Sequence, residues 1–174
     1  MQKKSMDDLG RKTVEAFREA RKTPIILILD NVRSMHNVGS VFRTADAFLV
    51  ESIFLCGYTP QPPHRDIHKT ALGATETVAW AYFADTREAI AEAARRGCEI
   101  WAVEQVHDSV ALNALGVEPE ERLALVFGNE AEGVQADLLP LCKGSIEIPQ
   151  QGTKHSLNIS VAVGIVLWEL SRNR

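Results

Sequence analysis

Short apolar runs alternate along the chain with segments in which apolar residues recur at helical spacing. The runs are rich in branched aliphatic and aromatic side chains, and runs of this length are typical of strands buried on both faces of a sheet. They predict strands at residues 25–29, 52–55, 77–83, 98–104, 123–127 and 145–148.

The segments between these strands have the pattern of helices. Pro24 ends the first of them, Gly97 stands where a helix stop is expected, and Asn37 and Thr86 suit helix N-termini. The predicted helices span residues 7–21, 38–48, 87–96, 111–115, 136–141 and 158–172, whereas residues 60–69, with three prolines, are expected to be irregular. Alternating buried strands and helices indicate an α/β fold with a mostly parallel sheet flanked by helices.

The size and composition of the chain fit one compact domain, at 174 residues and 45% hydrophobic. The longest apolar runs, residues 25–29 and 161–168, fall well short of the roughly 20 residues needed to cross a bilayer. No secretory signal is visible, so we expect a cytoplasmic protein. Cys56, Cys98 and Cys142 are odd in number and set in apolar sequence, which favours buried thiols and no metal site.

The formal net charge of −4 argues against a nucleic-acid partner, because such proteins usually present a basic face to phosphates. The positive residues are nevertheless clustered, while acidic residues gather elsewhere, notably at residues 118–121. For any single cluster, a solvated surface is the simpler interpretation. The clusters are Lys3, Lys4, Arg11, Lys12, Arg18, Arg21 and Lys22; then Arg33, His36 and Arg43; then His64, Arg65, His68 and Lys69.

Three loops at strand ends carry unusual residues, in the place where parallel sheets bind ligands. In the first, after residue 29, Asn37 is expected to cap the next helix and Gly39 allows close approach of a phosphate or another chain. Arg43 follows on that helix, where its guanidinium can reach the loop end. The alternative is a surface Arg43 paired with Asp46, three residues on.

The second loop follows the strand at residues 123–127, which runs directly into Gly128-Asn129-Glu130-Ala131-Glu132-Gly133. Glycines around polar residues resemble a turn that contacts a nucleotide, although an ordinary turn is the alternative. The loop lacks the Gly-Lys-Ser/Thr ending of a Walker motif, and the chain has no Gly-x-Gly-x-x-Gly sequence, which disfavours the usual modes of ATP and NAD binding.

The third loop follows residue 148 and places Ser156 and Asn158 before a helix rich in Val, Ile, Ala and Gly. Such a helix is expected to be buried on most sides, so polar groups at its start need partners. Gly164, with the small Ser160 and Ala162, permits tight packing against a neighbouring element or subunit.

Taken in order, these three segments resemble the motifs of the SpoU/TrmH family of SPOUT RNA methyltransferases. The resemblance covers residues 24–174, which makes them the methyltransferase domain and residues 1–23 an N-terminal helical extension. The matching motifs are Asn37-x5-Arg43-Thr44, then Phe127-Gly128-Asn129-Glu130-x2-Gly133, then Ile148-Pro149-x6-Ser156-Leu157-Asn158-x-Ser160-x-Ala162.

The resemblance implies a homodimer with a deep C-terminal trefoil knot that binds S-adenosyl-L-methionine and methylates a ribose 2′-hydroxyl of tRNA or rRNA, with tRNA favoured. Arg43 matches the family's catalytic arginine, and Asn37, Glu130, Ser156 and Asn158 match polar residues of the same centre. Because an arginine rarely loses its proton, orienting the hydroxyl and stabilising negative charge is an easier role than that of a base. The residues that match the cofactor site are Val103, Glu104, Gly128, Asn129, Ile148, Ser156 and Leu157.

The residues before Pro24 are too few for the separate RNA-binding domain of longer family members. RNA is therefore expected to bind the surface of the dimer, with the basic N-terminal helix, through residues that include Arg33, His36, Arg65, Lys69 and Lys154. Two rival hypotheses remain at this point: a SPOUT enzyme that methylates a base, and a non-catalytic RNA-binding module that keeps the fold.

Overall fold

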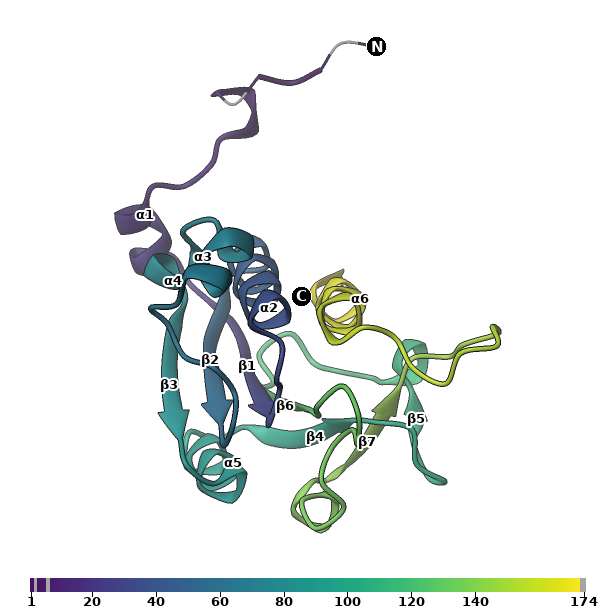
Figure 1. Ribbon diagram of the computed structural model, residues 1–174. Coiled ribbons are helices and arrows are strands. Elements are labelled where there is room, and N and C mark those ends of the chain that lie inside the picture. Colours follow the sequence, from purple (N-terminus) through teal and green to yellow (C-terminus); the bar gives the residue numbers. More distant parts are fainter. Residues whose placement is uncertain (2, 6, 173–174) are drawn as a thin grey trace.

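The computed structural model describes residues 1, 3–5 and 7–172, and its centre is a seven-stranded sheet (Figure 1). Every neighbouring pair of strands is parallel, and the order is β3-β2-β1-β6-β4-β7-β5. This confirms the α/β fold with a parallel sheet. The strands are β1 (Thr23–Asp30), β2 (Val50–Cys56), β3 (Ala79–Phe83), β4 (Glu99–Val103), β5 (Val110–Ala111), β6 (Leu123–Phe127) and β7 (Gly144–Glu147).

Helices cover both faces of the sheet. Figure 1 shows α2, α3, α4 and α6 on one face and α5 on the other. Side chains along β1 alternate accordingly, since Leu27 packs in the core beneath α2 and α6 whereas Ile28 packs with α5. The helices are α1 (Val14–Glu19), α2 (Met35–Ala47), α3 (Arg65–Ala71), α4 (Ala74–Thr77), α5 (Thr86–Arg95) and α6 (Ile159–Arg172), with 3-10 turns at Asp7–Leu9, Leu112–Ala114 and Leu139–Leu141.

Two predicted helix caps are wrong by a few residues. Ser34, not Asn37, caps α2, and its hydroxyl accepts a hydrogen bond from the Asn37 N–H at 3.3 Å. Asp85, not Thr86, caps α5 and accepts from the Arg87 N–H at 2.9 Å. In each case an acceptor side chain slightly upstream reaches the free amides of the first turn, so the helix begins earlier.

Other helix predictions also change. The helix expected at residues 7–21 is interrupted, because Gly10 adopts a left-handed φ of 55° and Thr13 caps a new helix. Residues 60–69 are less irregular than expected, because α3 begins within them. The helices expected at residues 111–115 and 136–141 are reduced to single 3-10 turns.

Gly39 allows α3, which lies partly in the segment expected to be irregular, to approach α2 closely. A Cβ on Gly39 would lie 2.1 Å from the Thr70 hydroxyl oxygen and 2.3 Å from the Ile67 carbonyl oxygen, so the missing side chain lets α3 pack directly on α2. The close approach expected at Gly39 is therefore made by another segment of the same chain.

Helix α6 is buried on one side only. Val163, Val166 and Leu167 are fully buried against the sheet and α2. The opposite side, together with the residue just before the helix, forms an apolar stripe of Leu157, Val161, Ile165 and Trp168, and Trp168 is 63% exposed. The expectation of burial on most sides is thus wrong for the single chain. No helix in the described part of the chain is long and apolar enough to span a membrane.

Candidate cofactor pocket and catalytic centre

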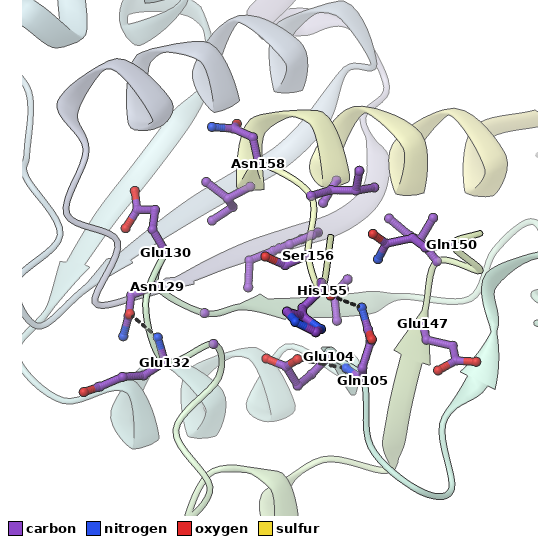
Figure 2. Close-up of a pocket in the computed structure, with 18 of the residues that line it drawn as sticks. Glu104, Gln105, Asn129, Glu130, Glu132, Glu147, Gln150, His155, Ser156 and Asn158 are labelled. Atoms are coloured by element: carbon purple, nitrogen blue, oxygen red, sulfur yellow. Dashed lines mark hydrogen bonds between the residues drawn. The ribbon is translucent and has the colours of Figure 1, made fainter. Parts of the chain in front are cut away.

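A pocket of about 500 Å³ lies at the carboxyl ends of the sheet's central strands (Figure 2). Its walls come from the ends of β4, β6 and β7 and from the residues before α6, as expected for ligand binding at strand ends. The structure brings into this lining all seven residues expected to bind the cofactor, together with Glu130 and Asn158. Their roles remain predictions, although segments far apart in sequence now share one cavity.

The second motif forms a closed turn on one side of the pocket. Backbone hydrogen bonds of 3.1 Å run in both directions between Asn129 and Gly133. The Asn129 side-chain oxygen accepts from the amides of Ala131 and Glu132, so a buried side chain holds the turn from inside. A Cβ on Gly128 would lie 1.8 Å from the Gly133 carbonyl carbon, so only glycine fits there.

A chain of hydrogen bonds joins the three motifs. The Asn158 amide donates to the Asn37 Oδ1 at 3.1 Å, and the Asn37 amide donates to the Glu130 Oε1 at 2.8 Å. Glu130 also accepts the backbone N–H groups of Arg33 and Ser34, each at 3.1 Å. Asn37 therefore does not cap α2 but links the turn to the start of α6.

The Glu130 carboxylate is held in its ionised form. Partial burial raises its pKa, but hydrogen bonds from the Arg33 N–H, the Asn37 amide and the Ser34 N–H outweigh this effect and place the pKa below its ordinary value. The carboxylate is thus occupied as an acceptor that fixes the loop before α2.

Arg43 does not line the pocket. Its side chain is exposed on α2, about 9 Å along the helix axis from Asn37 at 1.5 Å per residue. The alternative pairing with Asp46 is absent from the ion pairs of the described residues, and Asp46 instead accepts a hydrogen bond from Thr77. The residues expected to bind RNA are also exposed: Arg33, His36, Arg65, Lys69 and Lys154.

The sequence did not single out several further residues of the lining. Gln105, Gln150 and His155 lie at the cavity in Figure 2, and the Gln105 amide donates to the His155 carbonyl oxygen at 2.8 Å. Glu147 also lines the pocket, but its carboxylate points away from the centre and accepts a hydrogen bond from the Ser109 hydroxyl at 2.7 Å. Each lies within three residues of a predicted site residue. This closeness in sequence was the only feature from which their place in the pocket could have been predicted.

The pocket combines apolar walls with an excess of negative charge. Val103, Ile148 and Leu157 supply apolar surface. Four glutamates, Glu104, Glu130, Glu132 and Glu147, are among the lining residues, although the carboxylates of Glu132 and Glu147 point away from the cavity in Figure 2. Among the lining residues that the structure describes, none is Lys or Arg.

Such a pocket suits a flat ligand that carries positive charge, because apolar walls accept a ring and carboxylates attract a cation. The fold and the site together define an α/β enzyme that holds a small molecule beyond the ends of parallel strands. The sequence model of the SpoU rRNA Methylase family matches residues 24–168. The chain therefore belongs to this family of RNA methyltransferases.

Named relatives act on both rRNA and tRNA. The chain is 32% identical over 170 residues to the 23S rRNA (guanosine-2′-O-)-methyltransferase RlmB of Vibrio parahaemolyticus, covering 95% of this chain and 66% of the relative. It is 30% identical over 164 residues to the tRNA (guanosine(18)-2′-O)-methyltransferase of Thermus thermophilus, covering 94% of this chain and 82% of the relative. The chain thus spans about two thirds of the length of the first relative and more of the second.

A solved structure shares the fold. The AdoMet-bound rRNA methyltransferase of Sinorhizobium meliloti superposes with a TM-score of 0.78 at 28% identity, covering 90% of this chain and 59% of that one.

Proposed function

We propose that the chain transfers a methyl group from S-adenosyl-L-methionine to a ribose 2′-hydroxyl of tRNA or rRNA. The observation that carries this proposal is the convergence of three separate motifs on one pocket, where Asn37, Glu130 and Asn158 are hydrogen-bonded in series. Family membership and the guanosine 2′-O-methyltransferases among the relatives support the same function.

The pocket fits S-adenosyl-L-methionine by size and by charge. Its volume of about 500 Å³ lies within the range of small-molecule sites. Val103, Ile148 and Leu157 would hold the adenine ring, and the glycine-bordered turn at Gly128 would leave backbone groups free to bond the nucleoside. The surrounding carboxylates complement the charge of a sulfonium.

The chain's own residues then have to align the attacking oxygen. The cofactor, when bound, would supply an electrophilic methyl group: as the 2′-oxygen gains a bond to the methyl carbon, the bond from that carbon to sulfur would break, sulfur would leave as a neutral thioether, and the hydroxyl proton would pass to solvent water. Asn37 and Asn158 are positioned by Glu130 to orient the ribose, which lowers the entropic part of the barrier. The Arg43 guanidinium stabilises the negative charge that develops on the oxygen.

A homodimer completes this centre. Arg43 lies outside the pocket of its own chain, and the apolar stripe of α6 is uncovered beside α2. A second copy docked on that stripe would bury it and bring its Arg43 to the pocket. Exposed apolar faces of this kind mark interfaces more often than free surface.

Replacing Trp168 by Glu is expected to convert the dimer to a monomer. The charge would have to be buried in the contact, where it has no partner. Light scattering after size exclusion would show the mass fall from twice to once the chain mass of 19.2 kDa. Leu141→Glu is the matched control, because Leu141 is an exposed apolar residue outside the stripe. A dimeric Trp168→Glu variant would exclude this interface.

The exposed positive side chains at the start of α2 and on α3 form the surface that we expect to bind RNA. Arg33 and His36 stand near the start of α2, and α3 carries Arg65 and Lys69 directly beside it, since the Thr70 hydroxyl donates to the His36 carbonyl oxygen at 3.0 Å. Binding to such a surface weakens with salt.

We also propose that the catalytic domain begins at residue 24, as the family match supports, and that the protein is cytoplasmic.

The decisive test is methylation of unmodified RNA. Transcripts of tRNA and rRNA, incubated with the protein and S-adenosyl-L-methionine carrying a labelled methyl group, are expected to gain a 2′-O-methyl at a mapped nucleotide. A transcript with a 2′-deoxy sugar at that nucleotide should gain none. Continued labelling of the deoxy transcript would indicate a base methyltransferase, and failure to bind the cofactor by calorimetry would indicate a non-catalytic RNA-binding module.

A further inference from the structure

Two carboxylates stand on either side of the strand that leads into the Gly128 turn. In the sheet, Phe127 of β6 pairs with Leu29 of β1 and with Val103 of β4. The next residues are Asp30, the last of β1, and Glu104, the first after β4, so two acidic residues lie on either side of Gly128 at the same level of the sheet. This symmetry places negative charge on both sides of the base of the turn.

Asp30 is fully buried, yet it takes no part in the chemistry described above. Its Oδ2 accepts the backbone N–H of Gln135 at 3.1 Å, and its Oδ1 accepts the Gln135 side-chain amide at 2.8 Å. The hydroxyl of Thr86, at the start of α5, donates to Oδ1 at 2.7 Å, and the Asn31 amide donates at 3.0 Å. A buried carboxylate with four donors is a fixed anchor.

Glu104 holds the residue next to Gln135. Its Oε2 accepts the Val134 N–H at 2.9 Å, and its Oε1 accepts the Gln105 N–H at 2.9 Å. The carboxylate also occupies the space beside Gly133, where a Cβ would lie 2.1 Å from Oε2. Successive amides of the chain leaving the turn are therefore bound by carboxylates from two different strands.

We propose that Asp30 is a positioning residue for the cofactor turn, acting together with Glu104 as a two-carboxylate clamp on the amides of Val134 and Gln135. The turn is closed by the bonds between Asn129 and Gly133 and by those to the Asn129 side chain, and Glu130 ties it to the loop before α2. None of these bonds fixes the orientation of the segment that leaves the turn at Val134 and Gln135. The clamp fixes that orientation before the cofactor arrives, so less conformational freedom is lost on binding. This inference rests on the proposed function, because it assigns the turn to S-adenosyl-L-methionine.

The test uses conservative carboxyl-to-amide variants of the full chain. In Asp30→Asn, an NH2 group replaces the Oδ2 atom that accepts the Gln135 N–H. Two donors then face each other, so this hydrogen bond to Gln135 is lost. We expect affinity for S-adenosyl-L-methionine, measured by calorimetry, to fall about tenfold or more. Glu104→Gln should act in the same direction. Asp137→Asn is the matched control, because Asp137 lies near the same segment but pairs with Arg87 on the surface.

A second measurement tests, without any cofactor, whether the two carboxylates hold the amides of Val134 and Gln135. Hydrogen exchange followed by NMR on the free protein should show faster exchange of the Gln135 amide in Asp30→Asn and of the Val134 amide in Glu104→Gln, with the β6 amide of Leu125 still protected. A merely structural role would instead speed exchange throughout the sheet. If Asp30→Asn fails to fold, Gln135→Ala, which removes only the side-chain donor, and Glu104→Gln carry the same test.

Each outcome has a distinct meaning. Unchanged exchange at Gln135 and unchanged cofactor affinity in a folded Asp30→Asn variant would overturn the clamp. General loss of protection in that variant would also overturn it in favour of a structural role. Absence of cofactor binding by the unmodified protein would refute the proposed function, while the exchange data would still show whether the two carboxylates fix the turn.

Discussion

The Arg43→Ala variant is expected to lose methyl transfer by roughly 100- to 1,000-fold while binding S-adenosyl-L-methionine almost as tightly as the unchanged protein. A loss of this size is what removal of one hydrogen-bond donor to a developing negative charge on oxygen costs in the rate of catalysis. Affinity is retained because Arg43 is exposed on α2 and lies outside the pocket lining. Single-turnover methylation and calorimetry measure the two quantities separately.

Arg95→Ala is a suitable control for that variant. Arg95 is also an exposed helical arginine, but it lies on α5 and pairs with Glu92. It should leave both rate and affinity unchanged. Near-normal turnover in Arg43→Ala would end the role assigned to Arg43, and a large loss of cofactor affinity would show that Arg43 holds the cofactor as well as the attacking oxygen.

The Gly128→Ala variant is expected to abolish cofactor binding. The added Cβ would lie 1.8 Å from the Gly133 carbonyl carbon and 2.0 Å from the Val134 nitrogen, and backbone atoms cannot yield as the end of a side chain can. The turn must open, so affinity measured by calorimetry should fall below detection, with a loss of stability of about 1–3 kcal/mol in urea unfolding. Gly152→Ala is the control, because a Cβ there meets nothing within 4 Å. Tight binding by Gly128→Ala would show that the turn does not hold the cofactor.

Mixing these two inactive variants asks which subunit supplies Arg43. In a mixed dimer, the Arg43→Ala subunit keeps an intact pocket and the Gly128→Ala subunit keeps its arginine. If Arg43 acts across the interface, activity returns in the mixture. If it acts within its own chain, neither pocket is complete and the mixture stays inactive.

Much of the fold could be predicted from the sequence, because buried parallel strands have an unmistakable local pattern. Residues 123–127 form β6 as expected, and the strand ends indicated the pocket. The cap of α2 was harder, since Ser34 and Asn37 are both good capping residues. Only the position of Glu130, distant in sequence, shows why Asn37 is used elsewhere.

The anchoring of the turn could not be predicted for the same reason. Asp30 ends a strand and has no local pattern that sets it apart, and its partner Gln135 is 105 residues away. Arg43 presents the opposite difficulty, because the motif marks it while the geometry of the single chain leaves it outside the site. The role proposed for it above would depend on a contact with a second copy of the chain.

The hydrogen bonds that Glu130 accepts from Arg33, Ser34 and Asn37 make the cofactor turn and the start of α2 one mechanical unit. A ligand that stiffens the turn also stiffens the loop that presents Arg33 to solvent. If RNA binds this loop and the cofactor binds the turn, as proposed above, ordering the loop for the first ligand spares the second ligand the same entropy loss, and we expect the two substrates to assist each other's binding. By thermodynamic reciprocity, RNA must raise cofactor affinity by the same factor by which the cofactor raises RNA affinity.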